Sequence, residues 1–196
     1  MSRSAVLRLA AELCKRDHVI AGTGPLDVIE DDEASPGTIT LDPGTGAGWV
    51  RLGKRQQGFA VFKSDKKADG AFLLLRSDTP SATAVAVELK SKLSLSELQK
   101  ALAQLRQSTH RLRALAGALG AAIESYRWVL AFSEDAVENP ERPDVVADRP
   151  AIDGGGLRAK PPATLVWRSG RAEEAFGAAT IDKVGRTTTG DATLRL

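Results

Sequence analysis

Three polar residue types near the middle of the chain have the spacing of a metal-binding hydrolytic site. Asp69 precedes one apolar run, while Glu88, Leu89 and Lys90 end a second. Carboxylate and carbonyl oxygens are the ligands that Mg²⁺ and Mn²⁺ prefer. If the two runs pair as strands, we expect Asp69, Glu88 and the Leu89 backbone carbonyl to bind such an ion.

Lys90 follows Glu88 by two residues, so on a strand both side chains point to the same face. A bound divalent cation makes water nucleophilic at neutral pH and stabilises the leaving oxygen of a phosphodiester. The ammonium group of Lys90 can then orient the attacking water, lower its pKa or stabilise the pentavalent phosphate. The pattern predicts phosphodiester hydrolysis, with Asp69, Glu88 and Lys90 as catalytic residues.

Two strands and a helix must position these residues. The runs 70–76 and 83–89 are almost entirely apolar, which is typical of strands covered on both faces, and a short link predicts a hairpin between them. Ser94 and Glu97 form a capping box, and leucines at a spacing of three and four residues predict a helix over residues 95–119.

The flanking segments predict smaller elements around this centre. They are a helix at 4–16, short strands at 25–29, 38–41, 49–52 and 58–63, a further central strand at 126–133, a loop or linker at 134–162, and a last strand at 163–168 followed by a polar tail. The length favours one domain, with residues 1–133 as its core, its motifs within 66–107, and residues 163–196 packed on it. The expected class is α/β or α+β, with a central mixed sheet flanked by helices.

The order strand, hairpin, strand, helix, strand, with Asp69 before the first strand and Glu88, Leu89 and Lys90 ending the second, resembles the PD-(D/E)xK nuclease superfamily. The resemblance covers roughly residues 66–132. It implies a restriction-endonuclease-like core, with the acid and the Glu-x-Lys triplet on adjacent central strands, and Mg²⁺ or Mn²⁺ as cofactor. Ala68 stands where many members have a proline.

The helical segment that contains Gln104 is similar to a glutamine motif of the RecB-like branch of that superfamily. In that branch the glutamine helps to order the site, which implies an accessory role for Gln104. Spacing alone does not choose between Gln104 and Gln99, which flank the leucine stripe on opposite sides. Ser108 stands where the branch usually has a tyrosine. Other branches add a glutamate from the first helix, for which Glu12 is the candidate.

Basic residues gather on both sides of these motifs, although the net charge of the chain is only +2. A polyanion is attracted by such a local excess of positive charge. The residues that we expect to contact the phosphates of a nucleic acid are Lys54, Arg55, Lys63, Lys66, Lys67, Arg106, His110 and Arg111. DNA is the expected nucleic acid in preference to RNA.

Several other classes of protein are excluded or disfavoured. The glycine-rich run 44–48 lacks the Gly-Lys-Ser/Thr of a nucleotide-binding loop and leads into a strand-like segment, so it predicts a turn. The single cysteine, Cys14, excludes an intrachain disulfide framework and favours the cytoplasm. No apolar run is long enough for a membrane span, so no membrane partner is expected.

These observations together predict a metal-dependent nuclease that hydrolyses phosphodiester bonds of DNA. The resemblance implies a homo-oligomer, or a subunit of a larger complex in a defence, restriction or repair system. The alternative is a catalytically inactive nuclease-like module that binds nucleic acid or a protein partner through its basic helix.

Overall fold

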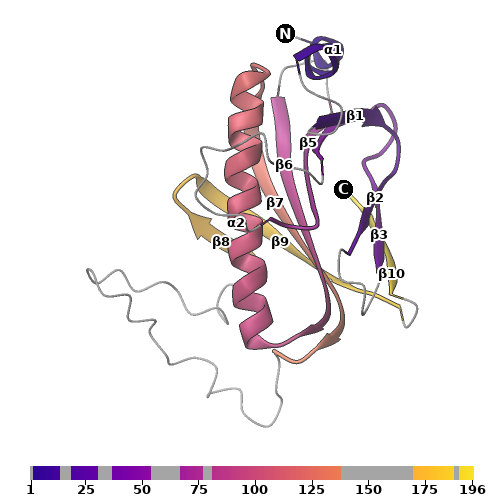
Figure 1. Ribbon diagram of the computed structural model, residues 1–196, viewed down its shortest axis with the longest axis vertical. Coiled ribbons are helices and arrows are strands. Elements are labelled where there is room, and N and C mark those ends of the chain that lie inside the picture. Colours follow the sequence, from indigo (N-terminus) through magenta and orange to yellow (C-terminus); the bar gives the residue numbers. More distant parts are fainter. Residues whose placement is uncertain are drawn as a thin grey trace.

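The chain forms an α+β fold in which a large mixed β-sheet and a small one are combined with two helices (Figure 1). The computed structural model describes residues 2–13, 19–30, 37–53, 67–76, 81–137, 170–187 and 190–196. The helices are α1 (Arg3–Leu13) and α2 (Leu95–Ala118). The strands are β1 (Val19–Thr23), β2 (Leu26–Ile29), β3 (Thr38–Asp42), β4 (Gly48–Leu52), β5 (Gly70–Leu75), β6 (Ser81–Leu93), β7 (Ala122–Asp135), β8 (Arg171–Glu174), β9 (Gly177–Gly185) and β10 (Asp191–Arg195).

The large sheet has the strand order β1-β4-β5-β6-β7-β9-β8. β5 and β6 pair antiparallel, with Gly70 opposite Val87, which confirms the predicted hairpin pairing. β6 then pairs in parallel with β7, and α2 is the crossover between them. Because β7 also pairs in parallel with β9, the sheet is mixed, as the sequence predicted.

Helix α2 covers one face of the large sheet along its length (Figure 1). Ser94 is its N-cap, and the Ser94 hydroxyl accepts a hydrogen bond from the backbone N–H of Glu97 at 3.3 Å, as the capping box predicted. Near its start, Leu98, Ala101 and Leu105 pack against apolar side chains of β6 and β7. Near its end, Leu112 and Leu115 share a second apolar cluster with α1. The two ends of α2 therefore meet different parts of the fold.

The small sheet, in the order β10-β3-β2, lies over the face of the large sheet opposite α2. Leu26, Val28, Ile39 and Leu41 from this sheet pack against apolar side chains of β5, β6 and β7. β10 pairs in parallel with β3, which joins the end of the described chain to its first quarter. The central strands are thus buried on both faces, which explains their continuous apolar sequence.

The structure corrects several predicted boundaries. The predicted strand 83–89 is the centre of β6, and the predicted strand 126–133 is the centre of β7, since both strands continue beyond their apolar parts. The prediction of a polar tail was wrong, because residues 171–195 include β8, β9 and β10. In β8 and β9 only Ala172, Ala179 and Ile181 are buried, and β10 has no buried residue, so the apolar signal of these strands is weak.

Two further predictions concern loops and membranes. Residues 44–48 form a turn that leads into β4, as expected, and Gly46 has a φ of 77°, which few other residues adopt. In the part of the chain that the structure describes, neither helix is long and apolar enough to cross a membrane. The predicted strands 58–63 and 163–168, and residues 138–162 of the predicted loop, lie outside the described residues.

Candidate active site

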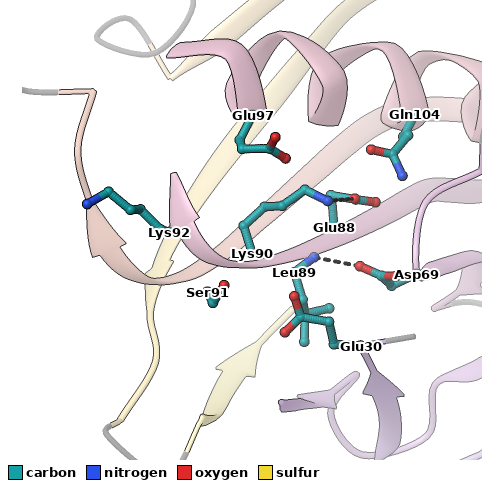
Figure 2. A pocket seen from close by; sticks show the side chains of 9 residues that line it. All are labelled: Glu30, Asp69, Glu88, Leu89, Lys90, Ser91, Lys92, Glu97 and Gln104. Atoms are coloured by element: carbon teal, nitrogen blue, oxygen red, sulfur yellow. Dashed lines mark hydrogen bonds and ion pairs between the residues drawn. The ribbon is translucent and has the colours of Figure 1, made fainter. Parts of the chain in front are cut away.

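Asp69 and Glu88 lie at the same end of the β5–β6 pair, as the sequence predicted. Gly70 is opposite Val87, so extending the antiparallel register by one residue places Asp69 opposite Glu88. The backbone N–H of Leu89 donates a hydrogen bond to Asp69 Oδ2 at 2.8 Å. Both acids line a cavity of about 410 Å³ (Figure 2). The residues that line it are Glu30, Asp69, Glu88, Leu89, Lys90, Ser91, Lys92, Glu97 and Gln104.

The carboxyl group of Glu88 is the most unusual group in the cavity. Glu88 is 0% exposed, and neither of its carboxylate oxygens accepts a hydrogen bond from the described residues. Burial, followed by the charge of Asp69, raises the pKa of Glu88 to about 8. A buried carboxylate is unfavourable unless a cation or a proton accompanies it.

Lys90 is the cation nearest to Glu88. Its Nζ lies 2.7 Å from Glu88 Oε1, which is ion-pair distance, although the angle is outside hydrogen-bond geometry. Burial favours the neutral amine, but the Glu88 carboxylate outweighs this effect, and the pKa of Lys90 is raised above its ordinary value. Lys90 therefore stays protonated at neutral pH. It can donate hydrogen bonds to water or phosphate, but it cannot accept a proton.

The backbone of Leu89 adds a further oxygen to this edge of β6. In an extended strand, the N–H and C=O of one residue point to the same side. Since the Leu89 N–H points to Asp69, the Leu89 carbonyl faces the same open edge, beyond the first residue of β5. This arrangement agrees with the expectation that the Leu89 carbonyl is available as a ligand.

Gln104 reaches the same cavity from the first half of α2 (Figure 2). Its Nε2 donates a hydrogen bond to the backbone carbonyl of Lys67 at 2.9 Å, two residues before Asp69. Gln99 is not among the residues that line the cavity. The contact with Lys67 thus selects Gln104 over Gln99, which the spacing of the two residues had left open.

The residues present fit a divalent cation with water in part of its coordination shell. Asp69 and Glu88 offer carboxylates, Leu89 offers a carbonyl, and the two Glu88 oxygens have no hydrogen-bond donors among the described residues. No three His, Cys, Asp or Glu side chains of the described part come close enough together to hold a metal ion by themselves. Mg²⁺ commonly keeps several waters and uses only one or two carboxylates, so this donor set is sufficient.

The structure differs from the predictions at two glutamates: Glu12 was predicted at the site but does not line the cavity, and Glu30 was not predicted but does. Glu12 is exposed on α1, lies 3.9 Å from Arg8, and is not among the residues that line the cavity, so the structure does not bring it to the site. Glu30, which no sequence pattern marked, follows β2 and lines the cavity. Its Oε2 accepts a hydrogen bond from Arg186 at 2.7 Å, and both side chains are buried. A partner 156 residues away leaves no local signal in the sequence.

The predicted phosphate-binding residues of the helix have internal contacts instead. Arg106 donates two hydrogen bonds to Glu174, at 2.6 and 2.7 Å, and Arg111 is only 5% exposed. His110 packs edge-on against Phe176 at 5.4 Å, and burial lowers its pKa. Lys67 lies partly exposed before β5, whereas Lys54, Arg55, Lys63 and Lys66 lie outside the described residues. Arg106 and Arg111 are therefore held within the fold more than the sequence indicated.

Comparisons with known proteins add no identification. No family model matches the chain, and neither the curated proteins nor the solved structures include a significant match. Function must therefore be argued from the cavity itself.

Proposed function

We propose that this protein is a metal-dependent nuclease that hydrolyses phosphodiester bonds, with Asp69, Glu88 and the Leu89 carbonyl as ligands of Mg²⁺ or Mn²⁺. The observation that carries the proposal is the buried carboxyl group of Glu88, which lies opposite Asp69 at the cavity and has the Lys90 ammonium 2.7 Å from its Oε1. The resemblance of this arrangement to the PD-(D/E)xK superfamily supports the same activity.

The chemistry requires an attacking water, stabilised charge on the phosphate and a proton for the leaving oxygen. When bound, the cation would lower the pKa of water and neutralise charge on the phosphoryl oxygens. Water adds to phosphorus and releases a proton to solvent, the bond from phosphorus to the leaving oxygen breaks, and that oxygen takes up a proton from solvent. Lys90, which stays protonated, orients the water and stabilises the negative phosphate. Asp69 is held in place by the Leu89 N–H.

The substrate that we propose is DNA, and the protein would act as an oligomer or within a larger assembly in defence, restriction or repair. The alternative of an inactive module that binds through the basic helix has less support. Arg106 is paired with Glu174 and Arg111 is buried, so the helix offers fewer free cations than its sequence indicated.

A cleavage assay tests the proposal. Plasmid DNA, single-stranded DNA and RNA are incubated with the protein in Mg²⁺, Mn²⁺ or EDTA, alongside Asp69→Asn and Lys90→Ala. We expect cleavage only with a divalent cation, and a loss of rate of at least about 100-fold in each variant. Arg171→Ala is the matched control, since Arg171 is 64% exposed on β8, pairs with Glu173 and does not line the cavity. Equal cleavage by wild type and both site variants would remove the assignment.

A further inference from the structure

Helix α2 holds the two residues that lead into Asp69 through side chains on successive turns. Ser108 Oγ accepts a hydrogen bond from the Ala68 backbone N–H at 2.8 Å. Gln104 Nε2 donates to the Lys67 carbonyl at 2.9 Å. Residues 104 and 108 are four apart, so they lie one above the other on the same face of the helix. Ser108 is 0% exposed and Ala68 is 3% exposed, so water does not compete for the first of these bonds.

The hydrogen bond from the Ala68 N–H to Ser108 lies beyond the end of the β5–β6 pairing. The pairing of β5 with β6 begins at Gly70, so it does not extend to Lys67 or Ala68. The direction of the Asp69 side chain depends on the peptide between Ala68 and Asp69, and this peptide follows the N–H that Ser108 fixes. The result is visible at Asp69 Oδ2, which lies 2.8 Å from the Leu89 nitrogen at the edge of the cavity (Figure 2).

We infer that Ser108 is a positioning residue for the cation site: its hydroxyl, together with Gln104, holds Asp69 in the orientation that binds metal. The inference rests on the proposed function, because Asp69 matters in this way only if it is a ligand. Position 108 is also where the sequence departs from the resembling branch, which has a tyrosine there. A side chain that does not touch the ion but orients a ligand commonly changes metal affinity by 10- to 100-fold.

The chain contains a matched control at the next residue. Thr109 is 1% exposed on the same helix, and its hydroxyl also serves a buried donor, the indole N–H of Trp128, at 2.9 Å. It donates in turn to the carbonyl of Leu105. Loss of either hydroxyl leaves one buried N–H without its acceptor, so both losses destabilise the fold for the same reason. Only the loss of Ser108 releases the segment before Asp69.

The test compares wild type, Ser108→Ala and Thr109→Val by calorimetric titration with Mn²⁺ and by thermal unfolding without metal. We expect both variants to unfold at a lower temperature, but only Ser108→Ala to bind Mn²⁺ about 10-fold more weakly. Ser108→Cys keeps a weak acceptor of similar size, so its affinity should lie between those of wild type and Ser108→Ala. It also supplies the measurement if the alanine variant does not fold.

The possible results separate this inference from the proposed function. Equal Mn²⁺ affinity in Ser108→Ala and wild type would overturn the positioning role and leave the metal site intact. An equal loss of affinity in Ser108→Ala and Thr109→Val would also overturn it, since the effect would then follow stability. Wild-type protein that binds no Mn²⁺ would overturn the proposed function, and the positioning role with it.

Discussion

Two buried glutamates line the same cavity, and their surroundings differ. Glu30 Oε2 accepts a hydrogen bond from Arg186, which is 1% exposed, and the Glu30 N–H donates to the Gly37 carbonyl. Glu88 has Lys90 at the same distance, 2.7 Å, but outside hydrogen-bond geometry, and the Lys90 side chain is 22% exposed. One acid accepts a hydrogen bond from a guanidinium, and the other has an ammonium as its ion-pair partner.

The difference indicates that Glu30 stabilises the fold, whereas Glu88 is the acid available for chemistry. A guanidinium presents several donors in a fixed plane, whereas an ammonium is a compact charge on a flexible stem. Glu30 connects the end of β2 to the end of β9 through Arg186. The carboxyl group of Glu88 can bind a cation, but its ionisation is unfavourable without one, since its pKa is raised to about 8.

The largest effect should come from breaking the Glu30 pair. Arg186→Met leaves a buried carboxylate without its cation, which should lower the free energy of unfolding by about 3 to 5 kcal/mol. The double variant Glu30→Met with Arg186→Met should recover most of this loss, because no charge then remains buried. Chemical denaturation measures both. A loss below about 1 kcal/mol in the single variant would show that Glu30 and Glu88 are not different in this respect.

Removing the charge of Glu88 should have the opposite sign. Its pKa is about 8 in the folded protein against 4.5 unfolded, so between these pH values the folded state retains a proton that the unfolded state releases. Wild-type stability therefore falls as the pH rises through this range. Glu88→Gln should be as stable as wild type near pH 4 and more stable at pH 9, by on the order of 3 kcal/mol. Parallel stability curves against pH would contradict the raised pKa.

The binding of a divalent cation should depend on Glu88 and not on Glu30. Mn²⁺ at about 100 times its dissociation constant should stabilise the wild-type protein by about 2.7 kcal/mol, because it binds the folded state alone. Glu88→Gln should lose this stabilisation, while the Glu30→Met, Arg186→Met double variant should retain most of it. Thermal unfolding with and without Mn²⁺ measures the shift. Stabilisation that survives in Glu88→Gln would move the cation away from Glu88.

The smallest effect should come from Glu12, the exposed acid that the resemblance offered as a third ligand. Glu12→Gln should change the free energy of unfolding by less than about 0.5 kcal/mol, because exposed ion pairs contribute little. Its Mn²⁺ affinity should equal that of wild type in calorimetric titration. A clear loss of affinity would mean that α1 approaches the cavity in solution.

The sequence predicted those parts of the site that depend on local pattern. Asp69 and Glu88 were found because apolar strands are easy to recognise, and their ends are therefore easy to place. Gln104 followed from the helical stripe and the resemblance. Arg111 carried a usable signal, since it is three residues after Ser108 and four before Leu115, both on the buried face of α2. The burial of Arg111, which is 5% exposed, agrees with this spacing.

The rest depends on contacts between distant segments. Arg106 looked like a surface cation because Glu174 is 68 residues away, and Glu30 looked like one of several loop acids because Arg186 is 156 residues away. The strands β8 and β9 bury few residues and β10 buries none, so their polar sequences carry little evidence of a sheet. No local pattern reports such pairings, since they form only when the layers pack.

The parallel pairing of β10 with β3 also sets the order in which the protein can be completed during synthesis. The ribosome releases β5, β6, α2 and β7 in sequence, and their contacts are close along the chain. The β2–β3 pair is available early, but β10 joins β3 only after residues 191–195 are made, and Glu30 must wait for Arg186. Long-range parallel pairing is slow because closing a large loop costs entropy before any contact forms. The nascent chain therefore contains Asp69, Glu88 and Glu30 before the Arg186 partner of Glu30 and the third strand of the small sheet are available.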